Sequence, residues 1–173
     1  MGDLSIEEAM GAIFAQHMDA ELSGDLDTTL ATMTTNPHIV SVPTMVGGAG
    51  PAGVRDFYAN RLIGQFFPPD VELTPVSRTC DGNRLVDELI VSFTHTTKLD
   101  WMLPGVAPTG RAVSVACVVI VGVEDGKIAY EHIYWDQATV LVQIGLLDPT
   151  GLPVAGRDAA AKVLDPTIPG PHF

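Results

Sequence analysis

Histidine, tyrosine and aspartate side chains alternate along residues 130–136, where the sequence reads YEHIYWD. On a β-strand, side chains two positions apart point to the same face, so His132, Tyr134 and Asp136 are expected to share one face. Desolvation raises the pKa of a carboxyl group in the wall of an apolar pocket, which suits it to proton transfer. The pattern therefore predicts an acid–base site with Asp136 as the proton shuttle and His132 beside it.

Other segments supply further candidates for this site. The stretch FTHTTKLDW, residues 93–101, offers His95 as a third catalytic candidate and Trp101 as a residue that shapes the pocket. His17 falls in the apolar stripe of a helix expected over residues 4–22, and Tyr58 lies in another helix, expected over residues 51–67. We expect four side chains to contact a substrate: Trp101, His17, Tyr58 and Tyr134.

Each candidate also has an ordinary structural explanation. Asp136 directly precedes QATVLVQIG and is equally suited to cap a helix there by accepting backbone N–H groups. His132 and His17 are also compatible with half-buried or core positions, and Tyr58 with simple packing. A β-bulge in the strand would exchange its faces and turn Glu131 and Trp135 inward instead.

Three other kinds of site have weaker support. The segment GAGPAG, residues 48–53, satisfies G-x-G-x-x-G, but a dinucleotide site needs parallel βαβ units, and the later strands follow one another through tight hairpins. His95, His132 and Asp136 have the composition of a two-histidine, one-carboxylate metal site without the close spacing of a metal motif. No G-x-S-x-G segment is present, and neither Cys80 nor Cys117 has a basic neighbour that would activate it.

The composition restricts the possible partners. The 173 residues include 9 basic and 21 acidic side chains, giving a formal charge of −12, which argues against nucleic acid and anionic membranes. No apolar run approaches the length of a membrane span, and the first residues lack the pattern of a signal peptide. We therefore expect a cytoplasmic protein with reduced cysteines and a small molecule as its partner.

The expected elements follow one another as helices and then strands. Helices are predicted near residues 4–22, 24–34 and 51–67, with a strand over residues 37–46 between the second and the third. Strands rich in β-branched residues follow at 70–79, 84–99, 111–124 and 127–136, and Asp81-Gly82 and Asp125-Gly126 predict tight hairpins between them. This order indicates an α+β domain over residues 1–147, followed by a Pro- and Gly-rich arm over residues 148–173.

The order of elements and the end of the last strand, YWDQATVLVQIGLL, resemble the NTF2-like fold and, within it, the SnoaL-like polyketide cyclase group. That group typically shows a strand-terminal aspartate and then a Gln–hydrophobic–Gly sequence, matched here by Asp136 and by residues 143–145. The His-Thr segment at His95 and the P-T-G-R sequence at residues 108–111 match it as well. The resemblance covers residues 5–147.

The resemblance implies a cone in which the N-terminal helices pack on a strongly curved, mainly antiparallel sheet that encloses an apolar pocket, and it implies a homodimer. Asp136 then takes the role of the group's acid–base aspartate, and His17 on the first helix covers the pocket. The Arg-x-Asp set of limonene-epoxide-hydrolase-like members is not found. His95 and His132 with Tyr134 could imitate the histidine pair of scytalone-dehydratase-like members.

These observations lead to two functional hypotheses. The first is acid–base chemistry without a cofactor on a small, largely apolar cyclic or carbonyl-bearing molecule, of the cyclase, isomerase, dehydratase or hydrolase type. The alternative is a non-catalytic small-molecule-binding or dimeric assembly module of the same fold, in which Asp136 serves only as a helix cap.

Overall fold

The computed structural model describes residues 6–170, which form one α+β domain with a C-terminal extension. The helices are α1 (Ile6–Ser23), α2 (Leu26–Ala31), α3 (Gly50–Phe57), the π-helical turn η1 (Tyr58–Leu62), α4 (Gln137–Gln143) and α5 (Asp158–Leu164). The strands are β1 (Met33–Ser41), β2 (Val46–Ala49), β3 (Glu72–Asp81), β4 (Arg84–Thr94), β5 (Ala112–Glu124) and β6 (Lys127–Trp135). The predicted α+β class is confirmed.

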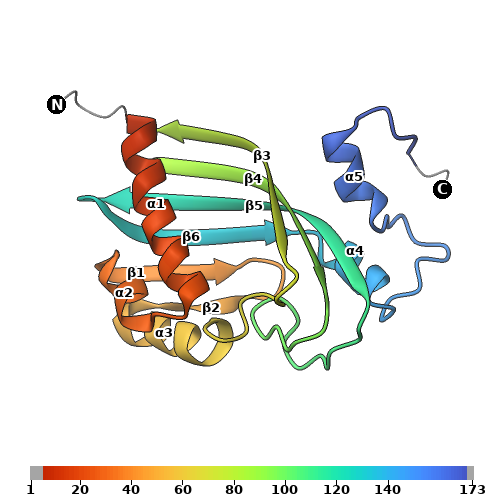
Figure 1. The fold of residues 1–173 in the computed structure, drawn as a ribbon, viewed down its shortest axis with the longest axis horizontal. Helices are drawn as coiled ribbons and strands as arrows, with labels where there is room; N and C mark the ends of the chain where they lie inside the picture. Colours follow the sequence, from red (N-terminus) through yellow and green to blue (C-terminus); the bar gives the residue numbers. More distant parts are fainter. Residues whose placement is uncertain (1–5, 171–173) are drawn as a thin grey trace.

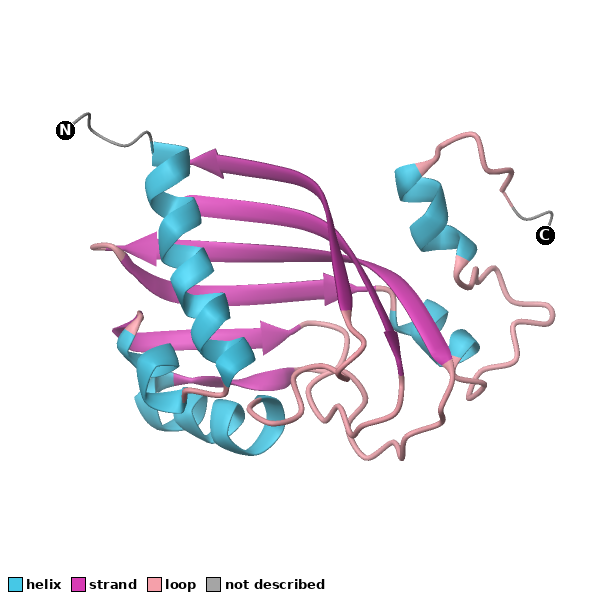
Figure 2. Ribbon diagram, in the orientation of Figure 1, coloured by secondary structure: helices cyan, strands magenta, loops and turns pink. Residues whose placement is uncertain are grey.

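The six strands form one curved sheet in the order β2-β1-β6-β5-β4-β3 (Figure 2). All neighbours pair antiparallel except β1 and β6, which run parallel, so the sheet is mixed. Both predicted hairpins are present, joining β3 to β4 and β5 to β6, although the two turn residues of the first are Gly82 and Asn83. At the second turn Asp125 and Gly126 both have positive φ, as a two-residue type I′ hairpin requires.

Helix α1 crosses one face of the sheet, while α3 lies beside β1 and β2 (Figure 1). On the face of α1 toward the sheet, Met10 and Phe14 are buried and hold the helix there, and His17 and Glu21 are buried as well. None of the helices in the described part of the chain is long and apolar enough to span a membrane.

The glycine-rich segment that imitates a dinucleotide motif has a packing role. Residues 46–49 form strand β2, and Pro51 occupies the first turn of α3. A side chain on Gly47 would meet the carbonyl oxygen of Ile39 at 2.0 Å, and one on Gly48 would meet that of Gly53 at 2.1 Å. These two glycines therefore allow β2 to lie directly against β1 and α3.

The loop between β4 and β5 lies at one end of the sheet and is part of the core (Figure 2). Leu99, Met102 and Leu103 are completely buried. Trp101, which the sequence predicted to shape the pocket, is 2% exposed, and its Nε1 donates to the carbonyl oxygen of Phe66 at 2.8 Å.

The extension after α4 leaves the domain and returns through α5, which packs beside β5 (Figure 1). Ala160 is fully buried in this contact, and the hydroxyl of Thr139 donates to the carbonyl oxygen of Ala155 at 3.3 Å. The extension is therefore anchored to the same subunit over its described residues.

Candidate active site

A cavity of about 700 Å³ lies between α1 and the concave face of the sheet. Most of its wall is apolar, because α1 and strands β3 to β6 contribute their inward side chains. The aromatic rings of Phe14, Phe66, Phe67 and Trp101 line one part of it. The buried carboxyl groups of Glu21 and Glu131 also line it. The cavity thus combines a surface for an apolar ligand with two acidic groups.

Glu21 and Glu131 belong to a buried cluster around the ring of His17. The Nε2 atom of His17 lies 3.1 Å from Oε1 of Glu21, 3.1 Å from Oε1 of Glu131 and 3.0 Å from the hydroxyl of Tyr58. His17 and Tyr58 are 0% exposed, and the two glutamates are 3% and 2% exposed. Three elements therefore bring four polar side chains together: α1, η1 and β6.

Opposing effects set the protonation of this cluster. Burial lowers the pKa of His17, but the charges of Glu131 and then Glu21 outweigh burial and raise it to about 10. At neutral pH His17 is therefore an imidazolium, and its Nε2–H donates to the hydroxyl of Tyr58. Burial and the charge of Glu131 raise the pKa of Glu21. Burial and the charges of Glu21 and Glu131 raise the pKa of Tyr58 well above its usual range.

The two carboxyl groups keep hydrogen-bonding capacity free. Oε1 of Glu21 and Oε1 of Glu131 are buried without a hydrogen-bond donor of good geometry among the described residues, and the Nε2 of His17, 3.1 Å from each, is their ion-pair partner. Buried polar atoms are rarely left without a partner in native proteins, and a catalytic role is one explanation for such an exception. We interpret these oxygens as available to a group that enters the cavity.

His17, Glu21 and Glu131 are also the group within the described residues that has the composition to hold a metal ion, with ligand atoms within 4.8 Å of one another. A metal ion would have to displace the proton that Nε2 donates to Tyr58, and the raised pKa of His17 opposes this. His95, His132 and Asp136, the metal set that the sequence suggested, are not brought together in the part of the chain that is described.

A nucleophilic cysteine is not supported either. The cavity also contacts Cys117, but burial raises the pKa of its thiol to about 12, so almost no thiolate forms at neutral pH. Cys117 and Cys80 are both free, as the sequence predicted.

The structure places Asp136 as a helix cap. Its carboxylate accepts the backbone N–H of Thr139 at 3.2 Å and the Thr139 hydroxyl at 2.6 Å, so it is the N-cap of α4. It is not among the residues that line the cavity. The contacts match the structural alternative for Asp136, and they give its predicted role as a proton shuttle no support.

The prediction that His132 and Tyr134 face the pocket is wrong. From Tyr130 to Trp135 the strand alternates strictly, with Glu131, Ile133 and Trp135 buried and Tyr134 40% exposed on the outer face. Ile133 and Trp135 turn inward because they bury more apolar area than their neighbours. The register shift between β5 and β6 lies before Tyr130, where the absent side chain of Gly122 makes room for the Tyr130 ring.

His132 has a different set of contacts on the outer face. Its Nε2 lies 3.1 Å from Nε2 of His38 on the neighbouring strand, and both rings contact Tyr130. Burial and then the charge of His38 lower the pKa of His132. This pair is separated from the cavity by the sheet itself.

The remaining candidates divide between the cavity and the core. His95 is fully buried outside the cavity, with Nδ1 3.2 Å from the hydroxyl of Thr109, and burial lowers its pKa. Trp101 lines the cavity, as predicted. His17 and Tyr58 lie behind Glu21 and Glu131 rather than in the cavity wall.

Sequence reasoning missed Glu21 and Glu131. Glu21 follows His17 by four residues on α1, a spacing that places two side chains on one helix face, so this pair had a local signal. Glu131 was assigned to the outer face of its strand, and no local signal connects it with residues 17 or 58.

Known proteins place this architecture in a family. The SnoaL-like domain family matches residues 14–131, which is more than half of the sequence, and the chain therefore belongs to it. Among curated proteins, none matches the sequence.

Solved structures share the fold at low sequence identity. A proposed SnoaL-like polyketide cyclase from Jannaschia sp. CCS1 is 18% identical, with a TM-score of 0.66 over 86% of this chain and 99% of that one. IdmH, a proposed polyketide cyclase from Streptomyces antibioticus, is 23% identical, with a TM-score of 0.58 over 78% and 97%. A proposed ketosteroid isomerase from Kribbella flavida DSM 17836 is 15% identical, with a TM-score of 0.51 over 78% and 82%.

Proposed function

We propose that this protein is an acid–base enzyme that acts on a small, largely apolar, carbonyl-bearing molecule, in a reaction of the isomerase or cyclase type. The observation that carries the proposal is the pair of buried carboxyl groups, Glu21 and Glu131, in the wall of one mainly apolar cavity. Family membership supports an enzyme in general terms, and structures of similar fold are described as proposed cyclases and isomerases.

The two carboxyl groups differ in their surroundings, and this suits them to different roles. Burial and the charge of Glu131 raise the pKa of Glu21, which favours a protonated Glu21. Glu131 enters from β6 rather than from α1, and its Oε1 lies 3.1 Å from the Nε2 of the His17 imidazolium. Paired titratable groups whose environments separate their protonation states are the usual arrangement of a general acid and a general base.

In the proposed step, Glu131 removes a proton from the carbon next to the carbonyl group. The C–H electron pair forms the C=C bond of an enol while the carbonyl oxygen takes the proton of Glu21. Collapse of the enol returns a proton from Glu131 to carbon and restores the proton of Glu21, so the protein is unchanged. An isomerase protonates a different carbon. In a cyclase the enol carbon attacks a second carbonyl group of the same molecule, the oxygen of that group takes the proton held by Glu131, and the enol hydroxyl returns its proton to Glu21 as the first carbonyl group re-forms.

Hydrogen–deuterium exchange tests this proposal without knowledge of the natural substrate. Cyclic ketones such as 2-tetralone and cyclohexanone would be incubated with the protein in D₂O, and exchange at the α-carbon followed by proton NMR. We expect acceleration by the wild type and a loss of about 10²–10⁴-fold in Glu131→Gln, because general acid–base catalysis contributes that much. Glu124→Gln is the matched control, since this glutamate is exposed at the end of β5.

Asp136→Asn distinguishes the cavity carboxylates from the aspartate that the sequence suggested. We expect this variant to keep its exchange rate, because Asp136 caps α4 outside the cavity. If Asp136→Asn lost activity and Glu131→Gln kept it, the proposed site would be wrong. Ligand binding without any exchange would instead favour the non-catalytic binding module.

The remaining expectations about partners stay predictions. The resemblance implies a homodimer, and multi-angle light scattering of the purified protein would measure its mass in solution. The formal charge of −12 continues to argue against nucleic acid and anionic membranes as partners. We propose that the only partner required for the chemistry is the small molecule itself.

A further inference from the structure

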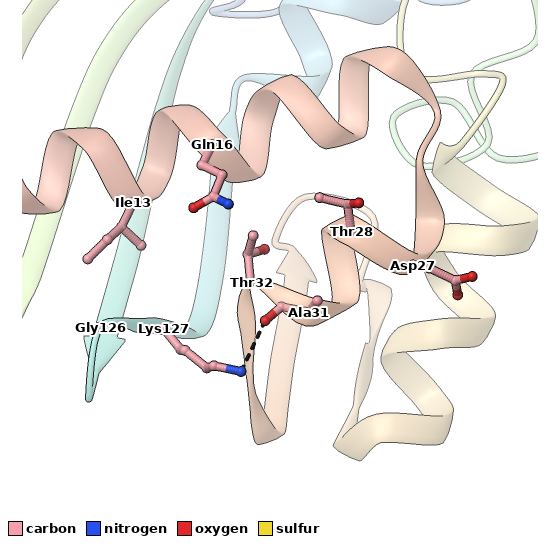
Figure 3. A pocket seen from close by; sticks show the side chains of 8 residues that line it. All are labelled: Ile13, Gln16, Asp27, Thr28, Ala31, Thr32, Gly126 and Lys127. Atoms are coloured by element: carbon pink, nitrogen blue, oxygen red, sulfur yellow. Dashed lines mark hydrogen bonds between the residues drawn. The ribbon is translucent and has the colours of Figure 1, made fainter.

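A second, smaller cavity of about 440 Å³ lies on the other side of α1 from the proposed active site. Its wall is built from α1, α2 and the turn between β5 and β6, and it includes Thr32, Gln16, Asp27 and Lys127 (Figure 3). The Nζ of Lys127 donates to the carbonyl oxygen of Ala31 at 3.1 Å, beside Thr32. Thr32 itself is 9% exposed and separates this cavity from the ring of His17.

The hydroxyl of Thr32 makes two short hydrogen bonds. Its Oγ1 lies 2.6 Å from Nδ1 of His17, and its own proton is donated to the carbonyl oxygen of Thr29 at 2.6 Å. Because a carbonyl oxygen only accepts, the hydroxyl proton is committed to Thr29 and the lone pairs of Oγ1 face the ring. The Nδ1 of His17 is therefore the donor in this contact.

The bond at Nδ1 completes the hydrogen bonding of the ring. The Nδ1–H of His17 donates to Thr32 and its Nε2–H donates to Tyr58, so both N–H groups of a fully buried imidazolium are satisfied. The charged groups that face the ring are Glu21 from its own helix and Glu131 from β6, with the Tyr58 hydroxyl from η1. No ionisable side chain of the described residues contacts Nδ1, so Thr32 alone serves that nitrogen.

We propose that Thr32 is a positioning residue that holds His17 as an imidazolium, with Nε2–H donating to the Tyr58 hydroxyl and lying 3.1 Å from both cavity carboxyl groups. This inference rests on the proposed function, because it assigns to Thr32 the control of the cation that lies beside Glu131. Thr32 contacts neither the large cavity nor its carboxyl groups and acts only through the ring.

Thr32→Val and Thr32→Ser form a matched pair of variants. Valine keeps the shape of threonine but removes the acceptor, which leaves a buried Nδ1–H without a partner. Serine keeps the hydroxyl and restores the bond. Thr32→Ala tests the second cavity, because the space it leaves opens toward that cavity and admits a water molecule to replace the hydroxyl.

The first measurement follows the two ring nitrogens of His17 by NMR in protein labelled with ¹⁵N-histidine, between pH 6 and pH 11. We expect both nitrogens to be protonated at pH 7 in the wild type and in Thr32→Ser. In Thr32→Val the midpoint of deprotonation should fall by about one pH unit, which corresponds to one hydrogen bond to a charged group. Thr32→Ala should lie between the two. An unchanged midpoint in Thr32→Val and Thr32→Ala would overturn the proposal.

The second measurement is the pH dependence of ketone hydrogen–deuterium exchange. Thr32→Val should lose activity at a lower pH than the wild type, with kcat reduced and KM unchanged, and Thr32→Ser should restore the profile. A loss of activity that is equal at every pH, or that Thr32→Ser does not restore, indicates a merely structural role and contradicts the proposal.

The two measurements separate the failure of this inference from that of the proposed function. If the wild type accelerates no exchange, the proposed function fails, and the NMR titration alone decides whether Thr32 holds the ring. If Thr32→Val does not fold, as judged by circular dichroism, Thr32→Ala provides the variant that lacks the hydroxyl.

Discussion

Strand β6 carries a histidine-containing cluster on each of its two faces, and the two clusters differ in charge. On the inner face, Glu131 meets His17 and Glu21 in a buried cluster beside the large cavity. On the outer face, His132 contacts His38, and each ring nitrogen in that contact has another histidine as its partner. Both clusters bury imidazole rings at least in part.

The comparison shows that neighbouring charges, rather than burial alone, decide the state of a buried histidine. Burial lowers the pKa of both rings, yet the carboxylates raise that of His17 to about 10, while the charge of His38 lowers that of His132 further. A protonated His17 keeps a negative charge stable in an apolar wall. The lowered pKa of His132 favours its neutral form, so His132 offers no such support.

The largest expected effect on stability comes from removing the cation of the inner cluster. His17→Leu leaves two buried carboxyl groups without their positive partner, and we expect a loss of about 3–5 kcal/mol in the free energy of unfolding. Urea denaturation at pH 7 measures it. His132→Leu is the matched control on the outer face and should cost less.

A triple variant tests the cause of that loss. His17→Leu combined with Glu21→Gln and Glu131→Gln removes the two carboxyl groups as well as the imidazolium. This triple variant should recover part of the stability lost in His17→Leu. If the triple variant were no more stable than His17→Leu, lost packing rather than unpaired charge would explain the effect.

The two clusters should also give opposite dependences of stability on pH. The pKa of folded His17 is raised above its unfolded value of 6.5, so its contribution is complete below pH 6.5 and is lost as the pH rises toward 10. Urea unfolding of the wild type between pH 6.5 and pH 10 should show this decline. In His17→Leu the decline should be much shallower, and an equal decline would contradict the assigned state of His17.

Loss of the helix cap at Asp136 should have a smaller effect. Asp136→Ala removes the acceptor for the N–H of Thr139, and we expect a loss of about 1 kcal/mol in the free energy of unfolding. Thermal and urea unfolding measure it. The rate of ketone hydrogen–deuterium exchange by the folded variant should be unchanged. A large loss of activity would instead indicate that Asp136 is a catalytic residue.

The smallest expected effect is the acid sensitivity of the outer pair. The pKa of folded His132 is lowered below 6.5, so its contribution to stability is present above pH 6.5 and is lost as the pH falls below that value. His95 acts in the same direction, because burial lowers its pKa too. The difference between wild type and His132→Gln over pH 5–7 should isolate a contribution of about 1 kcal/mol or less.

Local patterns predicted much of the fold. The two Asp-Gly turns set the hairpins from β3 to β4 and from β5 to β6, since a turn of this kind depends only on the residues in it. The strand-terminal sequence around Asp136 and Gln143 supported the resemblance to the SnoaL-like group, and the family match confirms that resemblance. Asp136 as a helix cap was also visible locally, as one of two alternatives.

The site was harder to predict from the sequence, because its residues are distant from one another along the chain. The folding of α1 and η1 against the sheet brings together His17, Tyr58 and Glu131. No spacing in the sequence predicts that contact. The pair of His17 and Glu21 on α1 was the one local signal. Thr32 likewise comes into contact with the ring only through the packing of α2 against α1.

The sequence by itself determined that the side chains of Glu131, Ile133 and Trp135 share one face of a strand and those of His132 and Tyr134 the other, because a strand repeats every two residues. Only the tertiary structure decided which face is inside. That choice depends on the total apolar area that each face buries against α1 and the other strands, and it placed Ile133 and Trp135, and with them the carboxylate of Glu131, on the inner side.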